Sequence, residues 1–157
     1  MMKQIKENRI AIGLFIAAAL IMICTRLFVR PIIVRGESMS PTLSDGQFLL
    51  GEARFSGEDI GYDTIVVFDA KTEEDRFYIK RVVGLPGDVL EGREDGLLYR
   101  NGVAIHESFD TMWSTFPATT VPAGEYFVMG DNRNHSVDSR EFGPVAYESI
   151  RTIKNSQ

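Results

Sequence analysis

The chain has 157 residues, of which 44% are hydrophobic, so it is long enough for one domain with a buried core. Its single cysteine excludes an intramolecular disulfide and a cysteine-rich metal site, and its two histidines stand far apart, so we expect neither a metal nor another cofactor. The net charge of −5 divides unevenly: residues 1–35 carry six basic side chains and one acid, whereas residues 36–157 carry eleven basic side chains and 21 acids. A segment this acidic is poorly suited to nucleic acid, because phosphate contacts require clustered lysine and arginine.

The first predicted element is a membrane anchor over residues 10–29. Residues 10–25 contain no charged side chain, and the apolar run continues past Arg26, whose long side chain can reach toward the headgroups. About 20 helical residues span a bilayer, and Pro31 discourages a longer helix. No small-residue cleavage site follows the run, which favours a permanent anchor over a removed leader. Three basic residues flank the run on each side, so charge alone does not decide its orientation.

Residues 30–157 are predicted to form a compact, mainly β, antiparallel domain. Short runs of β-branched and aromatic residues bounded by Gly, Pro and Asp favour strands over helices. A smaller insertion is expected over residues 90–124, where Asn101-Gly102 between two apolar runs indicates a tight hairpin. Residues 107–124 contain two prolines and are expected to form an irregular loop. The four predicted strands outside this insertion are 48–50, 65–68, 77–83 and 126–129.

Three segments of this domain combine nucleophilic and titratable side chains. Ser38 precedes a proline-containing turn that can hold its hydroxyl outward at the end of a strand. Lys80 lies in an apolar strand, where burial would disfavour the ammonium form and make the amine a base near neutral pH. Arg81, on the opposite face of that strand, is expected to remain solvated and charged. Residues 130–140 are dense in hydrogen-bonding side chains, which can build a buried network that fixes other groups in place.

Four short motifs occur in order along the chain, at residues 38–42, 80–88, 130–133 and 136–140. Together they resemble the type I signal peptidases of bacteria, which are membrane-anchored Ser–Lys proteases with a β-rich fold that remove signal peptides from secreted proteins. The resemblance covers essentially the whole chain. The single span and Gly36 are similar to features of the enzymes of Gram-positive bacteria.

The resemblance implies a role for five polar residues. Ser38 matches the nucleophile and Lys80 the general base, and a serine hydroxyl does need an adjacent base because it is a weak nucleophile. Ser136 matches the serine that hydrogen-bonds to the lysine and orients it. Asp138 and Arg140 match a supporting ion pair.

The resemblance also implies how the substrate is held. The backbone N–H of Ser38 would be one oxyanion donor; in part of the family the second is a serine hydroxyl two positions earlier, where this chain has Gly36, so the second donor is not identified. The site would accept an extended peptide with small side chains at the first and third positions before the cut. Ordinary core packing would account equally well for the matching wall residues, which are Ile32, Val34, Met39, Leu43, Tyr78 and Ile79.

The partners implied by the resemblance are signal peptides of secreted preproteins and the lipid bilayer, with the secretion translocon as a further one. Residues 1–9 would lie in the cytoplasm and residues 30–157 outside the cytoplasmic membrane, so that Ser38 faces the side where signal peptides emerge. Two alternatives stay open: a catalytically silent relative that aids assembly of surface proteins, and a mitochondrial inner-membrane peptidase. A silent relative would be expected to lack the serine or the lysine.

Overall fold

The computed structural model describes residues 12–19, 22, 28–69, 77–106 and 115–155. Residues 12–19 are helical, and none of the helices within the described ranges has the length and apolar character needed to cross a membrane. Of the anchor expected over residues 10–29, residues 10, 11, 20, 21 and 23–27 lie outside the described residues.

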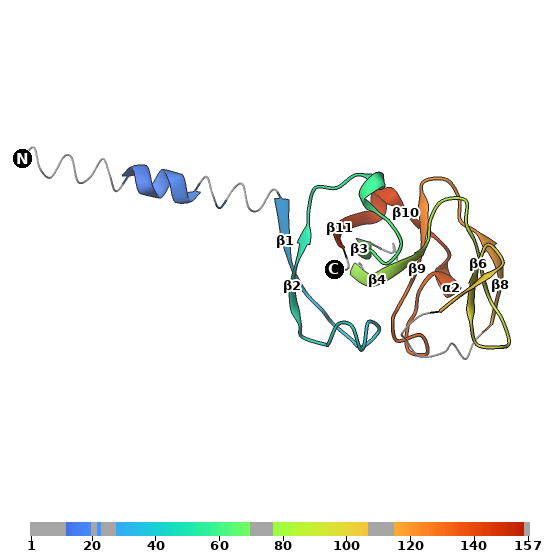
Figure 1. The fold of residues 1–157 in the computed structure, drawn as a ribbon. Helices are drawn as coiled ribbons and strands as arrows, with labels where there is room; N and C mark the ends of the chain where they lie inside the picture. The colour runs from blue at the N-terminus through green and yellow to red at the C-terminus, as the bar shows by residue number, and fades with distance from the viewer. Residues whose placement is uncertain (1–11, 20–21, 23–27, 70–76, 107–114, 156–157) are drawn as a thin grey trace, which may run out of the picture.

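Two antiparallel sheets form the body of the domain (Figure 1). The larger sheet has seven strands in the order β1-β2-β11-β3-β4-β9-β10, and the smaller has four in the order β7-β6-β5-β8. The prediction of a mainly antiparallel β-domain is therefore confirmed. The strands are β1 (Val29–Ile33), β2 (Phe48–Glu52), β3 (Ile65–Asp69), β4 (Phe77–Gly84), β5 (Val89–Gly92), β6 (Leu98–Arg100), β7 (Val103–Ile105), β8 (Phe116–Thr120), β9 (Glu125–Met129), β10 (Val145–Ala146) and β11 (Ile150–Lys154).

Short helical turns connect some of these strands. They are η1 (Gly57–Asp59), α2 (Ser139–Phe142) and η2 (Tyr147–Ser149). The turn α2 begins after Asp138, whose carboxylate accepts a hydrogen bond from the backbone N–H of Arg140. This is the usual way in which an aspartate caps a helix N-terminus.

Strand β4 connects hydrophobic clusters on its two faces. It pairs with β3 on one side and with β9 on the other, and its last six residues are buried. Because side chains alternate along a strand, Val82 packs into the cluster around Phe68 and Val128, whereas Val83 packs into the cluster around Leu90 and Phe127. Both faces of β4 are thus covered by protein, which matters for the polar residues that it carries.

The smaller sheet follows the predicted hairpin only in part. Asn101 and Gly102 connect β6 to β7 with positive φ at both residues, as a tight hairpin turn requires. The expectation of an irregular loop over residues 107–124 is wrong for residues 116–120, which form β8 and pair with β5. A proline is tolerated there because β8 is an edge strand, where a missing N–H breaks no ladder. Residues 107–114 lie outside the described residues.

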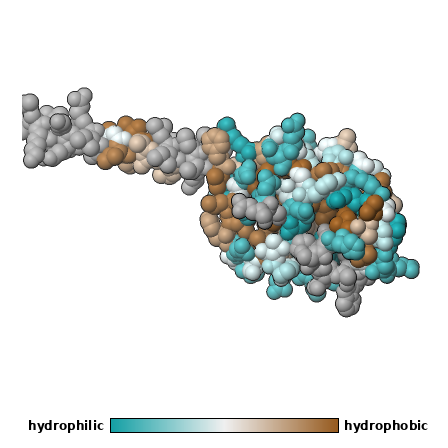
Figure 2. Space-filling view, in the orientation of Figure 1, coloured by the Kyte–Doolittle hydropathy of each residue, from teal (hydrophilic) through white to brown (hydrophobic). Residues whose placement is uncertain are grey.

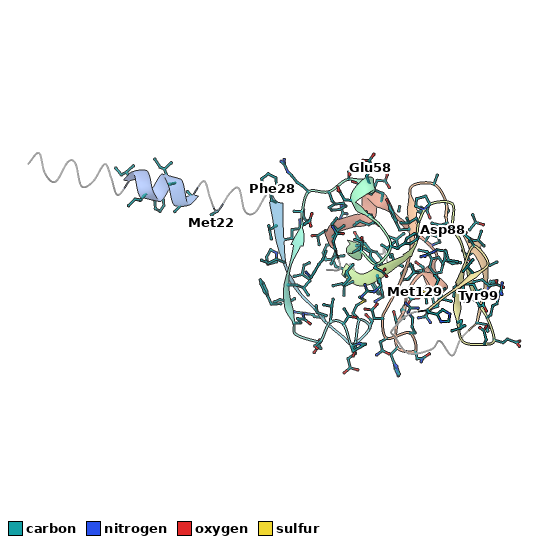
Figure 3. The ribbon with its side chains drawn as sticks, in the orientation of Figure 1. Met22, Phe28, Glu58, Asp88, Tyr99 and Met129 are labelled. Carbon is teal, nitrogen blue, oxygen red and sulfur yellow. The ribbon has the colours of Figure 1, made fainter. Side chains whose placement is uncertain are left out.

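Large hydrophobic side chains are exposed at the β1–β2 end of the domain (Figure 2). Ile33 is paired directly with Phe48, and Pro31 with Leu50, so these four side chains share one face of the hairpin. Ile33, Phe48 and Leu50 are each more than half exposed. Phe28 extends the same end of the domain toward the N-terminal segment (Figure 3). The solvated face of an antiparallel sheet is normally polar, so an apolar face here indicates an interaction surface and not an ordinary solvated one.

Candidate active site

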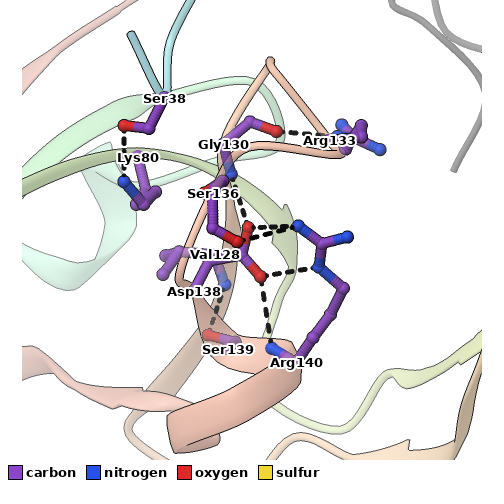
Figure 4. A network of polar contacts seen from close by, with 9 residues as sticks. All are labelled: Ser38, Lys80, Val128, Gly130, Arg133, Ser136, Asp138, Ser139 and Arg140. Atoms are coloured by element: carbon purple, nitrogen blue, oxygen red, sulfur yellow. Dashed lines mark hydrogen bonds and ion pairs between the residues drawn. The ribbon is translucent and has the colours of Figure 1, made fainter. Parts of the chain in front are cut away.

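Ser38 and Lys80 are 42 residues apart in the chain, and the fold brings their side chains into contact (Figure 4). Lys80 points from the middle of β4, and Ser38 lies in the turn that follows β1. Lys80 Nζ and Ser38 Oγ are 2.7 Å apart. At this distance the hydroxyl can transfer its proton directly to a neutral amine.

The environment of Lys80 prepares it to act as a base. Its side chain is only 3% exposed, and this burial lowers its pKa from 10.5 to about 8. Neighbouring charges act in both directions, because the Asp138 and Asp131 carboxylates raise the pKa and the Arg140 guanidinium lowers it. Desolvation is the larger effect, so a useful fraction of Lys80 is neutral near physiological pH.

A groove of about 840 Å³ opens beside these two residues. Its walls come from β1, from the turn after it, from β3 and β4, and from residues 135 and 137. The groove is largely apolar along β1 and gains polar groups at the Ser38 end. Four of the six residues matched to the substrate pocket line it: Ile32, Val34, Tyr78 and Ile79.

Met39 and Leu43, the other two matched residues, do not line the groove. Met39 is fully buried and Leu43 is 4% exposed, and both belong to the hydrophobic cluster that also contains Val34 and Ile79. They therefore support the groove wall from the core.

Asp138 is the centre of the polar network beneath the site (Figure 4). Its carboxylate is fully buried and accepts hydrogen bonds from Arg140 Nε and Nη2, both at 2.8 Å, in a bidentate ion pair. The same carboxylate accepts the backbone N–H of Gly130 at 2.9 Å. Asp138 thus ties together the two ends of the segment 130–140, which we call the catalytic loop.

Ser136 lies in the catalytic loop next to these groups, but its hydroxyl is buried without a hydrogen-bond partner among the described residues. The bond to Lys80 that the resemblance implies is not formed in this structure. A Cβ atom on Gly130 would overlap Ser136 and the carbonyl oxygen of Ser38. Glycine at position 130 therefore lets the catalytic loop pack directly against the turn that carries the serine.

Arg81 is not solvated, contrary to the expectation from strand alternation. It is 4% exposed, and its Nε and Nη2 atoms contact the two carboxylate oxygens of Asp131 at 2.8 and 2.7 Å. Alternation does place Arg81 opposite Lys80, but protein covers both faces of β4. The Arg81–Asp131 pair holds the start of the catalytic loop against β4. An acid two residues after an apolar strand was the available sequence signal for such a partner.

Two further residues of the catalytic loop reach the site, although no individual role was predicted for either from the sequence. His135 lines the groove, and Asn132 donates hydrogen bonds to the backbone on both sides of the bond between Glu37 and Ser38. Both residues look like ordinary surface polar residues in the sequence, since the Glu37 partner of Asn132 lies 95 residues away and the groove that His135 lines is formed mainly by distant segments.

Comparison with known proteins agrees with this geometry. Residues 8–155 match the family described as "Signal peptidase, peptidase S26". The chain is 34% identical to signal peptidase IB of Staphylococcus aureus, in an alignment that covers 96% of this chain and 87% of the relative, and 37% identical to signal peptidase I of Bacillus licheniformis, covering 82% and 75%. The crystal structure of a signal peptidase I from Enterococcus faecalis V583 superposes with a TM-score of 0.51 at 31% identity, covering 60% of this chain and 96% of that one. The chain therefore belongs to the bacterial type I signal peptidases of peptidase family S26, which are serine endopeptidases.

Proposed function

We propose that this protein removes signal peptides from secreted preproteins, with Ser38 as the nucleophile and Lys80 as the general base. The observation that carries the proposal is the 2.7 Å contact between Ser38 Oγ and Lys80 Nζ at the end of an apolar groove. Neutral Lys80 takes the proton of Ser38 as its oxygen attacks the scissile carbonyl, and then returns that proton to the leaving amine. Water, activated in the same way, hydrolyses the acyl-enzyme.

The groove supports a substrate in extended conformation with small side chains near the cut. Its wall residues Val34 and Ile79 are almost completely buried, so they are held firmly by the core and leave little depth for a large side chain. The supporting roles of Ser136, Asp138 and Arg140 belong to the same proposal. Asp138 and Arg140 fix the loop that packs against Ser38, and Ser136 lies between that ion pair and Lys80.

A membrane location follows from the same reading of the chain. We propose residues 10–29 as the anchor, residues 1–9 on the cytoplasmic side and residues 30–157 outside, beside the secretion translocon, with 90–124 a smaller insertion. The exposed apolar face of the β1–β2 hairpin supports contact between this end of the domain and lipid. Ser38 lies nine residues after Val29, so at about 3.3 Å per residue it is within roughly 30 Å of the anchor. A signal-peptide cleavage site is expected at the membrane surface, so this proximity would give Ser38 access to it.

The activity is tested by incubating the purified full chain, in detergent, with a preprotein and mapping the new N-terminus by mass spectrometry. We expect one cut after a small-x-small sequence. A matched preprotein with Trp in place of the small residue directly before the cut should stay intact, because the groove is shallow. An intact parent preprotein would contradict the proposal and favour a silent accessory relative.

The orientation is tested with a peptide tag placed after Gln157 and protease added to intact protoplasts. We expect the tag to be degraded without permeabilisation, because the catalytic domain should lie outside the membrane. A cytoplasmic protein in the same cells should survive as the control. A tag protected until the membrane is opened would reverse the orientation.

A further inference from the structure

We propose that Asn132 and His135 are positioning residues that aim the backbone N–H of Ser38 at the oxyanion formed during cleavage. The inference rests on the proposed role of Ser38 as the nucleophile. It assigns a role in the reaction to two loop residues whose side chains do not take part in proton transfer.

Asn132 holds the peptide group that contains the expected oxyanion donor. Its side-chain Nδ2 donates to the carbonyl oxygen of Glu37 at 3.2 Å, and its backbone N–H donates to the carbonyl oxygen of Ser38 at 3.0 Å. The Glu37 carbonyl and the Ser38 N–H belong to one planar trans peptide, in which they point in opposite directions. Fixing the carbonyl therefore fixes the direction of the N–H.

The Ser38 N–H itself is left for the substrate. Within the described part of the chain, it donates to no protein acceptor. A hydrogen bond to the carbonyl of a peptide group also polarises its N–H and makes it a stronger donor. Asn132 thus sets the direction of the Ser38 N–H and also makes it a stronger hydrogen-bond donor.

His135 in turn fixes the amide of Asn132. A carbonyl oxygen can only accept, so the amide group that faces Glu37 must be the NH₂, and Asn132 Oδ1 then faces the His135 ring. His135 Nδ1 is 3.2 Å from that oxygen and must carry a hydrogen. The backbone N–H of His135 also donates to the carbonyl oxygen of Asn132 at 2.9 Å. Protonation of the ring leaves this contact intact, because imidazolium also donates from Nδ1.

The need for such precise support follows from Gly36. This position offers no hydroxyl as a second donor, so oxyanion stabilisation depends more heavily on the Ser38 N–H. A preorganised donor is worth most when it requires no reorientation during the reaction. The absence of a Cβ at Gly130 allows the loop to approach Ser38 closely enough for these bonds to form.

The test compares Asn132→Asp, which keeps the shape but loses the NH₂ donor, with Asn155→Asp, which makes the same chemical change at an exposed position outside the catalytic loop and keeps the oxygen that accepts from Thr64 Oγ1. Kinetics with a preprotein are combined with inhibition by a substrate-like peptide aldehyde and by the corresponding peptide alcohol. Ser38 Oγ adds to the aldehyde carbon, its proton passes to Lys80 Nζ, and the carbonyl oxygen becomes an oxyanion. The alcohol binds the groove without forming one.

We expect Asn132→Asp to lower kcat about tenfold and to weaken the aldehyde by a similar factor, with KM and alcohol binding within about twofold. Asn155→Asp should change none of these values. Unchanged kcat in Asn132→Asp, or equal weakening of aldehyde and alcohol, would overturn the inference. Failure of the proposed function would look different: the unsubstituted enzyme would then form no aldehyde adduct at Ser38 by mass spectrometry.

A second test does not depend on the folding of Asn132→Asp. His106→Gln removes the other histidine, so ¹⁵N NMR then reports the ring of His135 directly. We expect the neutral ring to be the Nδ1–H tautomer, and His135→Phe to lower kcat by about threefold and to weaken the aldehyde more than the alcohol. An Nε2–H tautomer, or full kcat in His135→Phe, would contradict the role given to His135.

Discussion

Lys80→Met is expected to abolish preprotein cleavage while making the folded domain more stable at neutral pH. Methionine has a similar length and no amine, so Ser38 loses its base, and kcat/KM should fall by about 10⁴-fold or more. Ser38→Ala should be equally inactive, and the double variant should be scarcely worse, because the two groups act as a unit. Lys80→Arg should also be inactive, since guanidinium does not give up its proton.

The gain in stability follows from the lowered pKa of Lys80. In the unfolded chain this pKa is ordinary, 10.5, whereas in the folded protein it is about 8. Between about pH 8 and pH 10.5 the unfolded chain binds one more proton than the folded protein, so the free energy of unfolding rises with pH. Below about pH 8 Lys80 is charged in the folded protein, and the full free-energy cost of burying that charge is present. At about 1.4 kcal/mol per pKa unit the cost is roughly 3 kcal/mol. Loss of the hydrogen bond to Ser38 offsets about 1 kcal/mol of the gain.

Urea unfolding at several pH values measures this difference. Lys80→Met should exceed the parent by about 2 kcal/mol at pH 7, and the advantage should disappear as the pH approaches 10.5. In parallel, kcat/KM of the parent enzyme should rise with pH through a midpoint near 8, because only neutral Lys80 is a base. Near-parental turnover in Lys80→Met would refute the Ser–Lys mechanism, and a variant less stable than the parent at pH 7 would contradict the burial cost.

Asp138→Asn is expected to destabilise the domain by about 3 kcal/mol, because it leaves a buried guanidinium without its counter-charge. Asp138 is fully buried, and its carboxylate serves both Arg140 and the N–H of Gly130. The cost should appear as a lower urea midpoint. Arg93→Gln is a matched control, since it breaks an ion pair with Glu91 of similar length that is exposed, and it should change stability by less than about 1 kcal/mol.

The same substitution should also move the pH profile of cleavage. Asp138 raises the pKa of Lys80 and Arg140 lowers it, so Asp138→Asn should shift the activity midpoint to lower pH and Arg140→Gln should shift it to higher pH. A general loss of structure would move both variants in the same direction. Midpoints that move together would therefore show that the network acts on folding and not on the charge of Lys80.

Local patterns predicted most of the strands because their physical causes are local. The runs at 48–50, 65–68, 77–83 and 126–129 became β2, β3, β4 and β9, and the turn at Asn101-Gly102 formed the hairpin. Strand β8 was missed because its proline is acceptable only at a sheet edge, and edge position depends on the order of strands. Periodicity contains no information about that order.

In the candidate site, too, some features follow from local sequence patterns and others depend on the fold. Alternation placed Lys80 and Arg81 on opposite faces, but the burial of both faces depends on the position of β4 between β3 and β9. Spacing does not show that Ser38 meets Lys80, and their pairing was expected only from the resemblance to a family. The contacts of Asn132 join segments 95 residues apart, so no local pattern could reveal them.

The register of β1 has a consequence for the choice of substrates. All five residues of β1 pair with β2, so residues 29–33 of the segment that leads to Ser38 are held in the sheet and do not form a flexible linker. A flexible linker would let the nucleophile search a range of heights above the lipid, whereas a paired strand sets a single height. The fixed height of Ser38 would then select signal peptides by the distance of their cleavage site from the membrane as well as by the sequence of that site. Preproteins with a suitable small-x-small site at the wrong depth would pass uncut.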